Sequence, residues 1–364
     1  MTGELFVGLM SGTSLDGVDA VLSDLAGPKP RLLAYAHLPF DPALRRELLA
    51  LNTPGVNEIE RAALAGNELA KSYAAAVADL LVRSKTPATE VRGIGCHGQT
   101  VRHRPERGYT TQLGNAALLA ELTGIRVVAD FRSRDVAAGG QGAPLAPAFH
   151  AAAFADAAED RVAINLGGIA NLSVLPRHGK VTGFDSGPGN CLLDLWAARH
   201  LGAPHDDRGS WAAGGRADPE LLARMLQDPY FAALPPKSTG RDLFNETWLG
   251  NMLRGGEDPR TVQATLLELT ARSLANAIVR HCAGARRLIA CGGGTKNDAL
   301  MRRLAELAAP AALVTSEGHG IDPQQVEAAA FAWLAKQAVD GAAGNLPSVT
   351  GARGARVLGA IYPG

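Results

Sequence analysis

The chain has 364 residues, of which 46% are apolar, and its 36 basic side chains balance 36 acidic ones. This length suits two domains better than one core, and the zero net charge argues against nucleic acid or an anionic membrane as partner. The four cysteines lack metal-ligand spacing, and no apolar run reaches the ~18 residues of a membrane helix. Because a signal-peptide pattern is also absent, we expect a cytoplasmic protein with reduced thiols.

The predicted elements of the first part of the chain begin with a glycine-rich hairpin over 6–22. Helical periodicity follows over 42–51 and 58–83, and Asn57 is the expected N-cap of the second helix. We then predict a strand over 91–96, a helix over 116–123 that ends at Gly124, a strand over 125–129 and an alanine-rich helix over 148–157.

The second part of the chain opens with another glycine-rich hairpin over 162–175. A strand ending at Asp185, a helix over 192–200 capped by Asn190 and a polar, turn-rich stretch over 202–240 come next. Helices are predicted over 262–282, 298–309 and 326–339, a strand over 287–291, and an irregular tail to 364. This α/β alternation predicts a first domain over 1–158 and a second over 159–325, with 326–364 as a candidate to return to the first.

The repeated hairpin predicts two related domains that face each other across a cleft. Turns of this kind point backbone N–H groups at a ligand and can hold a polyphosphate. The second hairpin contributes Gly168, and Asp16 or Asp19 of the first could hold Mg²⁺, directly or through water. The alternative is an ordinary hairpin turn, since Asp-Gly is a strong turn signal. The phosphate-binding candidates of the first hairpin are Gly12, Thr13, Ser14, Leu15, Asp16, Gly17, Val18 and Asp19.

A glycine triplet, Gly292, Gly293 and Gly294, follows an apolar strand and precedes a helix. Such a loop offers a helix N-terminus to an anion or a flat floor to a base. A purely structural loop is the alternative.

Asp185 ends a strand on a tight glycine turn, which suits a general base that faces a cleft. Aspartate also caps turns often, and the residues alone leave the two interpretations equal. Glu327 lies in the first turn of a predicted helix. There its carboxylate either interacts favourably with the helix dipole or binds a metal.

Polar residues on loops after strands form a further candidate group. Arginine pairs with carboxylates, while glutamine and histidine bind sugar hydroxyls or amides. Any one of these residues is best interpreted as a solvated loop residue or as part of a local ion pair, such as Arg132 with Asp135. As a group they indicate a binding site for a polar small molecule. The members of the group are His97, Gln99, Arg132, Arg134, Asp135 and Gln141.

Together these segments closely resemble the bacterial anhydro-N-acetylmuramic acid kinases. The matching stretches lie in family order over nearly the whole chain, and they are 8–19, 97–100, 129–144, 183–190, 236–241 and 291–294. The resemblance implies two duplicated ribonuclease H-like domains, as in actin-like ATPases, around a central nucleotide cleft.

The resemblance also implies the reaction and its residues. ATP would phosphorylate O6 of 1,6-anhydro-N-acetylmuramic acid while water opens the anhydro ring, in peptidoglycan recycling. Asp185 would be the base, and the first hairpin would hold ATP and Mg²⁺. His97, Gln99 and Arg134 would bind the sugar, Gly292 to Gly294 would line the adenosine side, and Glu327 would stand near the metal.

The family further suggests a homodimer. Two rival hypotheses stay open from sequence. One is an ordinary sugar or small-molecule kinase that acts on a free hydroxyl, and the other is a sensor of ATP and sugar without turnover.

Overall fold

The computed structural model describes residues 3–12, 15–241, 243–282 and 284–364. The chain divides into two compact units, described separately below: unit 1 is Met1–Ala153 with Gln325–Gly364, and unit 2 is Phe154–Gln324. The first boundary lies five residues before the predicted one at 158/159. Phe154 belongs to unit 2 because its ring packs against His319 at 5.8 Å and its carbonyl accepts a hydrogen bond from Arg161.

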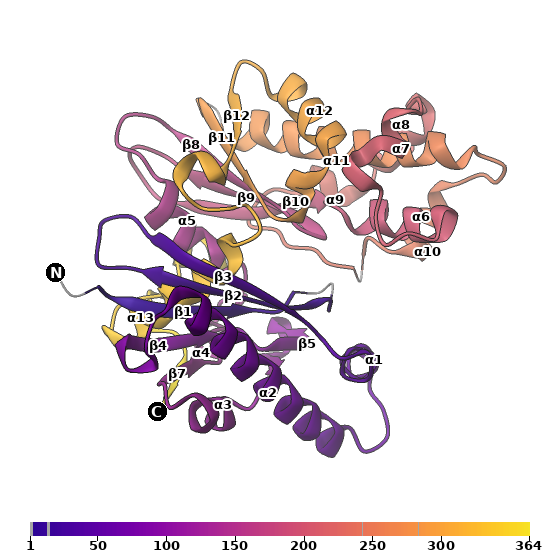
Figure 1. Cartoon of the computed structure of the whole chain (residues 1–364). Helices are drawn as coiled ribbons and strands as arrows, with labels where there is room; N and C mark the ends of the chain where they lie inside the picture. Colours follow the sequence, from indigo (N-terminus) through magenta and orange to yellow (C-terminus); the bar gives the residue numbers. More distant parts are fainter. Residues whose placement is uncertain (1–2, 13–14, 242, 283) are drawn as a thin grey trace. The chain divides into compact units, whose positions relative to one another are not determined.

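The sheet of unit 1 has six strands in the order β13-β7-β4-β1-β2-β3 (Figure 1). The hairpin strands β1, β2 and β3 are antiparallel, β4 and β7 continue parallel to β1, and β13 returns antiparallel to β7. A separate hairpin pairs β5 with β6. The bounds are β1 Leu5–Met10, β2 Gly17–Asp24, β3 Arg31–Pro39, β4 Val91–Cys96, β5 Gln99–Arg104, β6 Tyr109–Leu113, β7 Val127–Ala129 and β13 Ala360–Tyr362.

Helices cover both faces of this sheet. Successive side chains of a strand point to opposite faces, and β1 follows that rule: Val7 and Leu9 join the core under α2, whereas Phe6 joins the core under α13. The helices of unit 1 are α1 Pro42–Ala50, α2 Glu58–Ser84, α3 Ala116–Thr123, α4 Ser133–Ala137, α5 Ala146–Phe154, α13 Val326–Val339 and α14 Pro347–Thr350.

Two glycines allow α13 to lie directly on the sheet. Gly8 of β1 and Gly95 of β4 are register partners. A Cβ at Gly8 would lie 1.9 Å from the carbonyl oxygen of Ala328, and a Cβ at Gly95 would lie 1.9 Å from that of Phe331. No side chain fits at either position, so the approach of the helix requires glycine at both.

The sheet of unit 2 has five strands in the order β10-β9-β8-β11-β12. Its first three strands are antiparallel and the last two continue parallel to β8. This is the arrangement of β3-β2-β1-β4-β7, so the prediction of a duplicated ribonuclease H-like α/β fold is confirmed. The strands are β8 Arg161–Leu166, β9 Ile169–Leu175, β10 Thr182–Pro188, β11 Arg287–Cys291 and β12 Ala312–Thr315.

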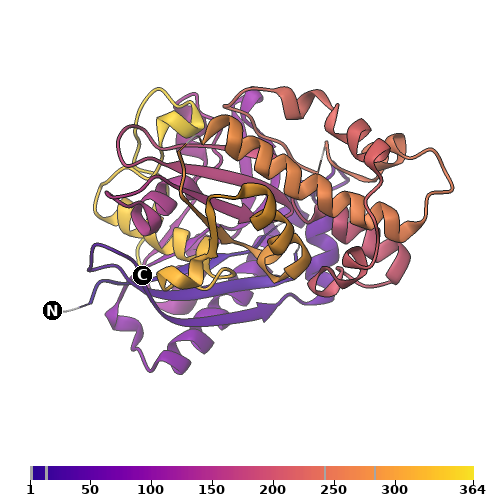
Figure 2. The same cartoon turned by 90° about the horizontal axis from the view of Figure 1, so that it is seen from above.

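The long helix α11 runs along this second unit and packs against β10, α6, α7, α8 and α12 (Figure 2). The helices of unit 2 are α6 Cys191–Leu201, α7 Ser210–Ala213, α8 Pro219–Leu226, α9 Pro229–Ala232, α10 Glu246–Met252, α11 Pro259–His281 and α12 Asp298–Ala308. Short 3₁₀ turns of the two units cover Ala88–Glu90, Pro105–Arg107, Asp207–Gly209, Gly293–Lys296 and Ser316–His319.

Some local predictions were wrong. The tail is not wholly irregular, because β13 adds an edge strand and α14 a helical turn. Asn57 and Asn190 precede their helices, but neither side chain caps a helix N–H: the amide of Asn57 contacts Glu60, and that of Asn190 donates to the carbonyl of Leu166. Within the described ranges, no helix has the length and apolar character needed to cross a bilayer.

Candidate active site

Asp185 of β10 is held by three hydrogen bonds to residues distant in sequence. Its backbone N–H donates to the carbonyl of Lys237 at 3.1 Å, and its carbonyl accepts from the Tyr230 hydroxyl at 2.7 Å. The carboxylate Oδ2 accepts from the backbone N–H of Thr239 at 2.9 Å. The carboxylate therefore binds a distant loop and does not cap the glycine turn that follows it, which was the structural alternative.

Burial raises the pKa of Asp185 to about 6, while the Thr239 N–H and the charge of Lys237 hold it down. A carboxylate with this pKa is mostly ionised at neutral pH, yet it is a stronger base than a solvated aspartate. Such tuning is typical of general bases.

A row of polar side chains crosses the sheet of unit 2 from Asp185. Asp185 is the register partner of Asn171 on β9, Asn171 is that of Asn165 on β8, and Asn165 is that of Cys291 on β11. Register partners share a face of the sheet. The Oδ1 atom of Asn171 is buried, and among the described residues it has no hydrogen-bond partner.

Sequence reasoning missed Asn171. Its signal was an amide that interrupts the apolar pattern of a strand six residues after Asn165 in Asn165-Leu-Gly-Gly-Ile-Ala-Asn171. A buried amide oxygen without a partner is costly unless a ligand satisfies it.

The second hairpin turn and the glycine triplet lie together in unit 2. The carbonyl of Gly168 accepts the N–H groups of Gly189 and Cys191 at the start of α6. Gly292 has φ +85°, and a Cβ there would lie 2.4 Å from Oδ1 of Asn165; a Cβ at Gly294 would lie 2.7 Å from Cβ of Leu166. These two glycines are needed for packing.

Gly293, by contrast, is exposed, and the nearest atom to a Cβ there would be 3.8 Å away. The backbone at Gly293 therefore offers an open surface, which suits a flat base. The guanidinium of Arg241 lies beside Gly168. Its Nε atom would be 3.8 Å from a Cβ placed on Gly168. Sequence reasoning had assigned no role to Arg241 beyond the family motif.

In unit 1 the first hairpin turn is only partly described, because Thr13 and Ser14 lie outside the described residues. The carbonyl of Gly12 accepts from the Gln99 amide at 3.3 Å. Leu15 is buried at φ +54°. The side chain of Asp16 is exposed at the turn.

The start of β2 packs closely after that turn. A Cβ at Gly17 would lie 2.4 Å from the carbonyl oxygen of Leu38, and Val18 is part of the core. Oδ1 of Asp19 accepts from the Tyr35 hydroxyl at 2.6 Å and contacts the His37 ring at 2.9 Å. Asp19 is therefore tied to β3 through one oxygen.

His97 is a neutral, oriented imidazole. The guanidinium of Arg132 donates to its Nε2 at 2.9 and 3.2 Å, so the ring proton resides on Nδ1. Burial, reinforced by the charge of Arg132, lowers the pKa of His97 to about 3. Nδ1 and the Oε1 atom of Gln99 are buried without a standard hydrogen bond among the described residues. The ring of His97 also interacts with the backbone of Ser11 and Gly98, which raises its pKa slightly against the effect of burial, so the amide oxygen of Gln99 is the acceptor that remains for a polar ligand.

The arginine beside His97 is Arg132, whereas Arg134 of α4 is exposed. Burial lowers the pKa of Arg132 to about 10, opposed by the charges of Glu327 and Asp135. Glu327, in the first turn of α13, thus lies on the same side of unit 1 as Arg132 and His97.

Asp135 has a structural role. Its carboxylate accepts from Asn345 at 2.6 Å, from Thr350 at 2.7 Å and from the backbone N–H of Gly142 at 2.8 Å, and it is fully buried. It anchors the segment after α13.

Over the described residues, no group of three or more His, Cys, Asp or Glu side chains forms a metal cluster. Mg²⁺ in a nucleotide site usually takes one or two carboxylates, with water and phosphate oxygens as its other ligands. The exposed carboxylate of Asp16 at the first hairpin turn is compatible with that requirement. Asp19 and Glu327 are the other two candidate carboxylates.

Comparison with known proteins gives a family for this chain. The family model described as "Anhydro-N-acetylmuramic acid kinase" matches residues 4–364. Proteins of that name from Variovorax paradoxus and Nitrosospira multiformis are 58% and 53% identical over the whole of both chains, and one from Cupriavidus pinatubonensis is 57% identical over 99% of both. The chain belongs to the anhydro-N-acetylmuramic acid kinase family.

Solved structures give weaker likenesses. Component A of (R)-2-hydroxyglutaryl-CoA dehydratase from Acidaminococcus fermentans is 13% identical with a TM-score of 0.47, over 92% of this chain and 98% of that one. A ROK family glucokinase from Streptomyces griseus is 16% identical with a TM-score of 0.41, over 92% and 99%. These values carry no argument about function, so the family assignment rests on the full-length relatives.

Proposed function

We propose that the protein is an ATP-dependent kinase that opens and phosphorylates 1,6-anhydro-N-acetylmuramic acid in peptidoglycan recycling. The observation that carries this proposal is Asp185, a half-buried carboxylate held at Oδ2 by the Thr239 N–H and with a pKa of about 6. The chain matches the kinase family over 4–364, and the carboxylate of Asp185 would serve as its general base.

The substrate needs such a base for a specific reason. O6 of the anhydro sugar is part of an acetal and has no proton to lose, so the base acts on water. Water adds to C1, its proton passes to Asp185, and the C1–O6 bond breaks. The freed O6 attacks the γ-phosphorus of ATP, and the products are N-acetylmuramic acid 6-phosphate and ADP.

The phosphates would lie along the first hairpin turn, Gly12 to Asp19, and against Gly168, with the adenine on the open backbone of Gly293 between Gly292 and Gly294. Asp16, Asp19 and Glu327 would hold Mg²⁺, directly or through water, and the ion would neutralise charge on the transferred phosphoryl group when bound. Asn171 would donate or accept a hydrogen bond next to Asp185, because it is the register partner of that residue and its amide oxygen is unsatisfied.

The sugar would contact unit 1 through His97 and Gln99, because the buried amide oxygen of Gln99 has no hydrogen-bond partner among the described residues and His97 belongs to the same family motif. The lactyl carboxylate would pair with Arg134, whose exposed guanidinium can move to meet it. We further propose a cytoplasmic homodimer, which light scattering and cell fractionation would test.

An ordinary kinase acting on a free hydroxyl would use Asp185 equally well, and a sensor would bind both ligands without turnover. Incubation with the anhydro sugar, ATP and Mg²⁺ in ¹⁸O water, followed by mass spectrometry, separates the three. Our proposal requires a product that gains one phosphate and one labelled water. Phosphorylation of an ordinary hexose alone, or binding without any product, would overturn it.

A further inference from the structure

A cavity lined by polar and apolar side chains lies wholly within unit 2, on the side of β10 that Ser186 faces. It has a volume of about 120 Å³ and is bounded by β10, α9, α11 and the loop at Lys237. That volume is several times the ~30 Å³ that one water occupies in the liquid. Asp185, the preceding residue on the strand, does not line it.

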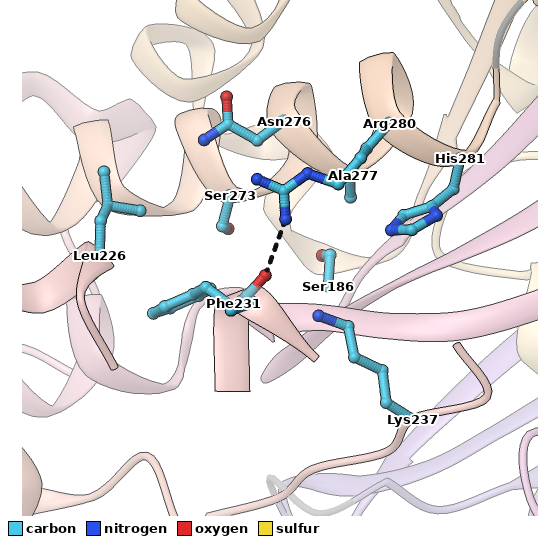
Figure 3. Close-up of a pocket in the computed structure, with 10 residues that line it drawn as sticks. Ser186, Leu226, Phe231, Lys237, Ser273, Asn276, Ala277, Arg280 and His281 are labelled. Carbon is cyan, nitrogen blue, oxygen red and sulfur yellow. Dashed lines mark hydrogen bonds between the residues drawn. The ribbon is translucent and has the colours of Figure 1, made fainter. Parts of the chain in front are cut away.

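The cavity gathers positive charge. Lys237, Arg280 and His281 line it together with Ser186, Ser273 and Asn276, and among the described residues none of the lining side chains is acidic (Figure 3). Figure 3 shows the amine of Lys237 and the ring of His281 directed toward Ser186, whereas the guanidinium of Arg280 is directed at the carbonyl of Phe231.

The hydrogen bonds of Lys237 and Arg280 go to backbone carbonyls, and the charge of Lys237 also interacts with that of Asp185. Lys237 Nζ donates to the carbonyl of Tyr230 at 3.0 Å and lies 4.5 Å from the centre of its ring. Arg280 donates to the carbonyl of Phe231 at 3.4 Å, and the edge of His281 meets the Phe184 ring. In the described parts of the chain, none of the three forms an ion pair with a carboxylate.

The charges repel one another. Burial and the charge of Arg280 lower the pKa of Lys237, opposed by the charge of Asp185, and burial with the charges of Lys237 and Arg280 lowers the pKa of His281. Basic residues in the last turn of a helix interact favourably with the negative end of the helix dipole. This effect would account for Arg280 and His281. Lys237 comes from a different segment, so the dipole does not explain why all three meet.

We infer that this cavity binds a small phosphate dianion, either inorganic phosphate or the terminal group of a phosphomonoester. Arg280 and Lys237 would supply charge, and Asn276 with the hydroxyls of Ser186 and Ser273 would supply further hydrogen bonds. The site is separate from the proposed nucleotide site, since it shares none of the glycines assigned to ATP.

The cavity is joined to Asp185 through one loop. The backbone carbonyl of Lys237 accepts the N–H of Asp185, and the N–H of Thr239 binds its carboxylate. An anion that holds the Lys237 side chain would therefore fix the loop that positions the proposed base. This coupling rests on the proposed function, whereas binding itself does not.

The test is calorimetric titration of the full-length protein with inorganic phosphate at constant ionic strength, with the nucleotide site saturated by a non-hydrolysable ATP analogue. Glucose 6-phosphate in a parallel titration distinguishes a phosphomonoester from free phosphate. We expect one site, weakened at least roughly tenfold by Arg280→Gln and by Lys237→Gln. Arg260→Gln, at the opposite end of the same helix, is the matched control and should bind as the parent does.

Two results would overturn the inference. One is the absence of phosphate or sugar phosphate binding up to roughly 10 mM. The other is binding that the ATP analogue abolishes or that both cavity variants retain in full. Either can occur whether or not the anhydro sugar is the substrate, so failure here is distinguishable from failure of the proposed function.

Discussion

Asp185 and Thr239 are 54 residues apart in the chain, yet the backbone N–H of Thr239 lies 2.9 Å from Oδ2 of Asp185. Asparagine would keep this hydrogen bond through its amide oxygen but could not take a proton from water. We therefore expect Asp185→Asn to lower kcat by at least about 10²-fold, the contribution typical of a general base, while nucleotide binding measured by calorimetry stays unchanged.

The control for that variant is Asp194→Asn. Burial also raises the pKa of Asp194 to about 6, and this residue lies on α6 of the same unit. It should retain turnover. Equal loss in both variants would show that removing either half-buried carboxylate of unit 2 is harmful, and the result would contradict a special role of Asp185.

The pKa of Asp185 predicts a pH dependence. The base must be ionised, so kcat/KM should fall as the pH drops below about 6. The charge of Lys237 holds this pKa down, and Lys237→Gln should therefore move the acid limb to higher pH. A pH–rate profile of the parent, Lys237→Gln and Arg260→Gln measures this. An unmoved limb in Lys237→Gln would contradict the assignment.

Asn171 offers a test that separates activity from stability. Its amide oxygen makes no hydrogen bond that holds the fold, so Asn171→Ala should lower the free energy of unfolding by less than about 1 kcal/mol. Turnover should nonetheless fall roughly tenfold, because the amide lies next to Asp185. Denaturant unfolding and steady-state kinetics give the two quantities.

Asn115→Ala should show the opposite pattern. The Asn115 side chain accepts the N–H of Leu118 and caps α3. Its loss should cost about 1 kcal/mol of stability and leave turnover intact. If Asn171→Ala behaves in this way instead, its role is structural.

The two arginines near the sugar-binding candidates can be separated by substitution. Arg134 is exposed, so Arg134→Gln should leave the melting temperature unchanged and raise KM for the acidic sugar more than KM for ATP. Arg132→Gln removes the donors to His97 and to the carbonyl of Gly142, so it should also reduce stability. A selective rise of the sugar KM in Arg132→Gln alone would transfer the carboxylate-binding role to Arg132.

The packing of α13 predicts a large effect of a single methyl group. Gly95→Ala places a Cβ 1.9 Å from the carbonyl oxygen of Phe331 and should destabilise the protein by about 1–3 kcal/mol or more. Gly250→Ala is the control, because a Cβ at this helical position would have no atom within 4 Å outside the helix backbone. This variant should raise the free energy of unfolding by about 0.5–1 kcal/mol. Thermal or denaturant unfolding measures both.

Local pattern was enough to predict most elements and the duplicated hairpins, because periodicity and glycine turns act over short distances. It could not show that the carboxylate of Asp185 binds the N–H of Thr239, or that Asn171 is the register partner of Asp185. It also could not show that Arg132, and not Arg134, lies beside His97. Each of these depends on which distant segments the sheets bring together. The edge strand β13 was missed for the same reason, since three exposed residues form it only by pairing with β7.

The discontinuity of unit 1 has a consequence for biosynthesis. Phe331 and Leu334 of α13 pack in the same core as Phe6, and the backbone of α13 packs against Gly8 and Gly95. The ribosome makes all of unit 2 before these residues emerge. Unit 2 can therefore fold as a continuous segment before α13 has been made. Until then, the face of the unit 1 sheet that α13 covers stays exposed. Nascent chains arrested before residue 326 should expose that apolar face to chaperones, and those arrested after release of α13 should not.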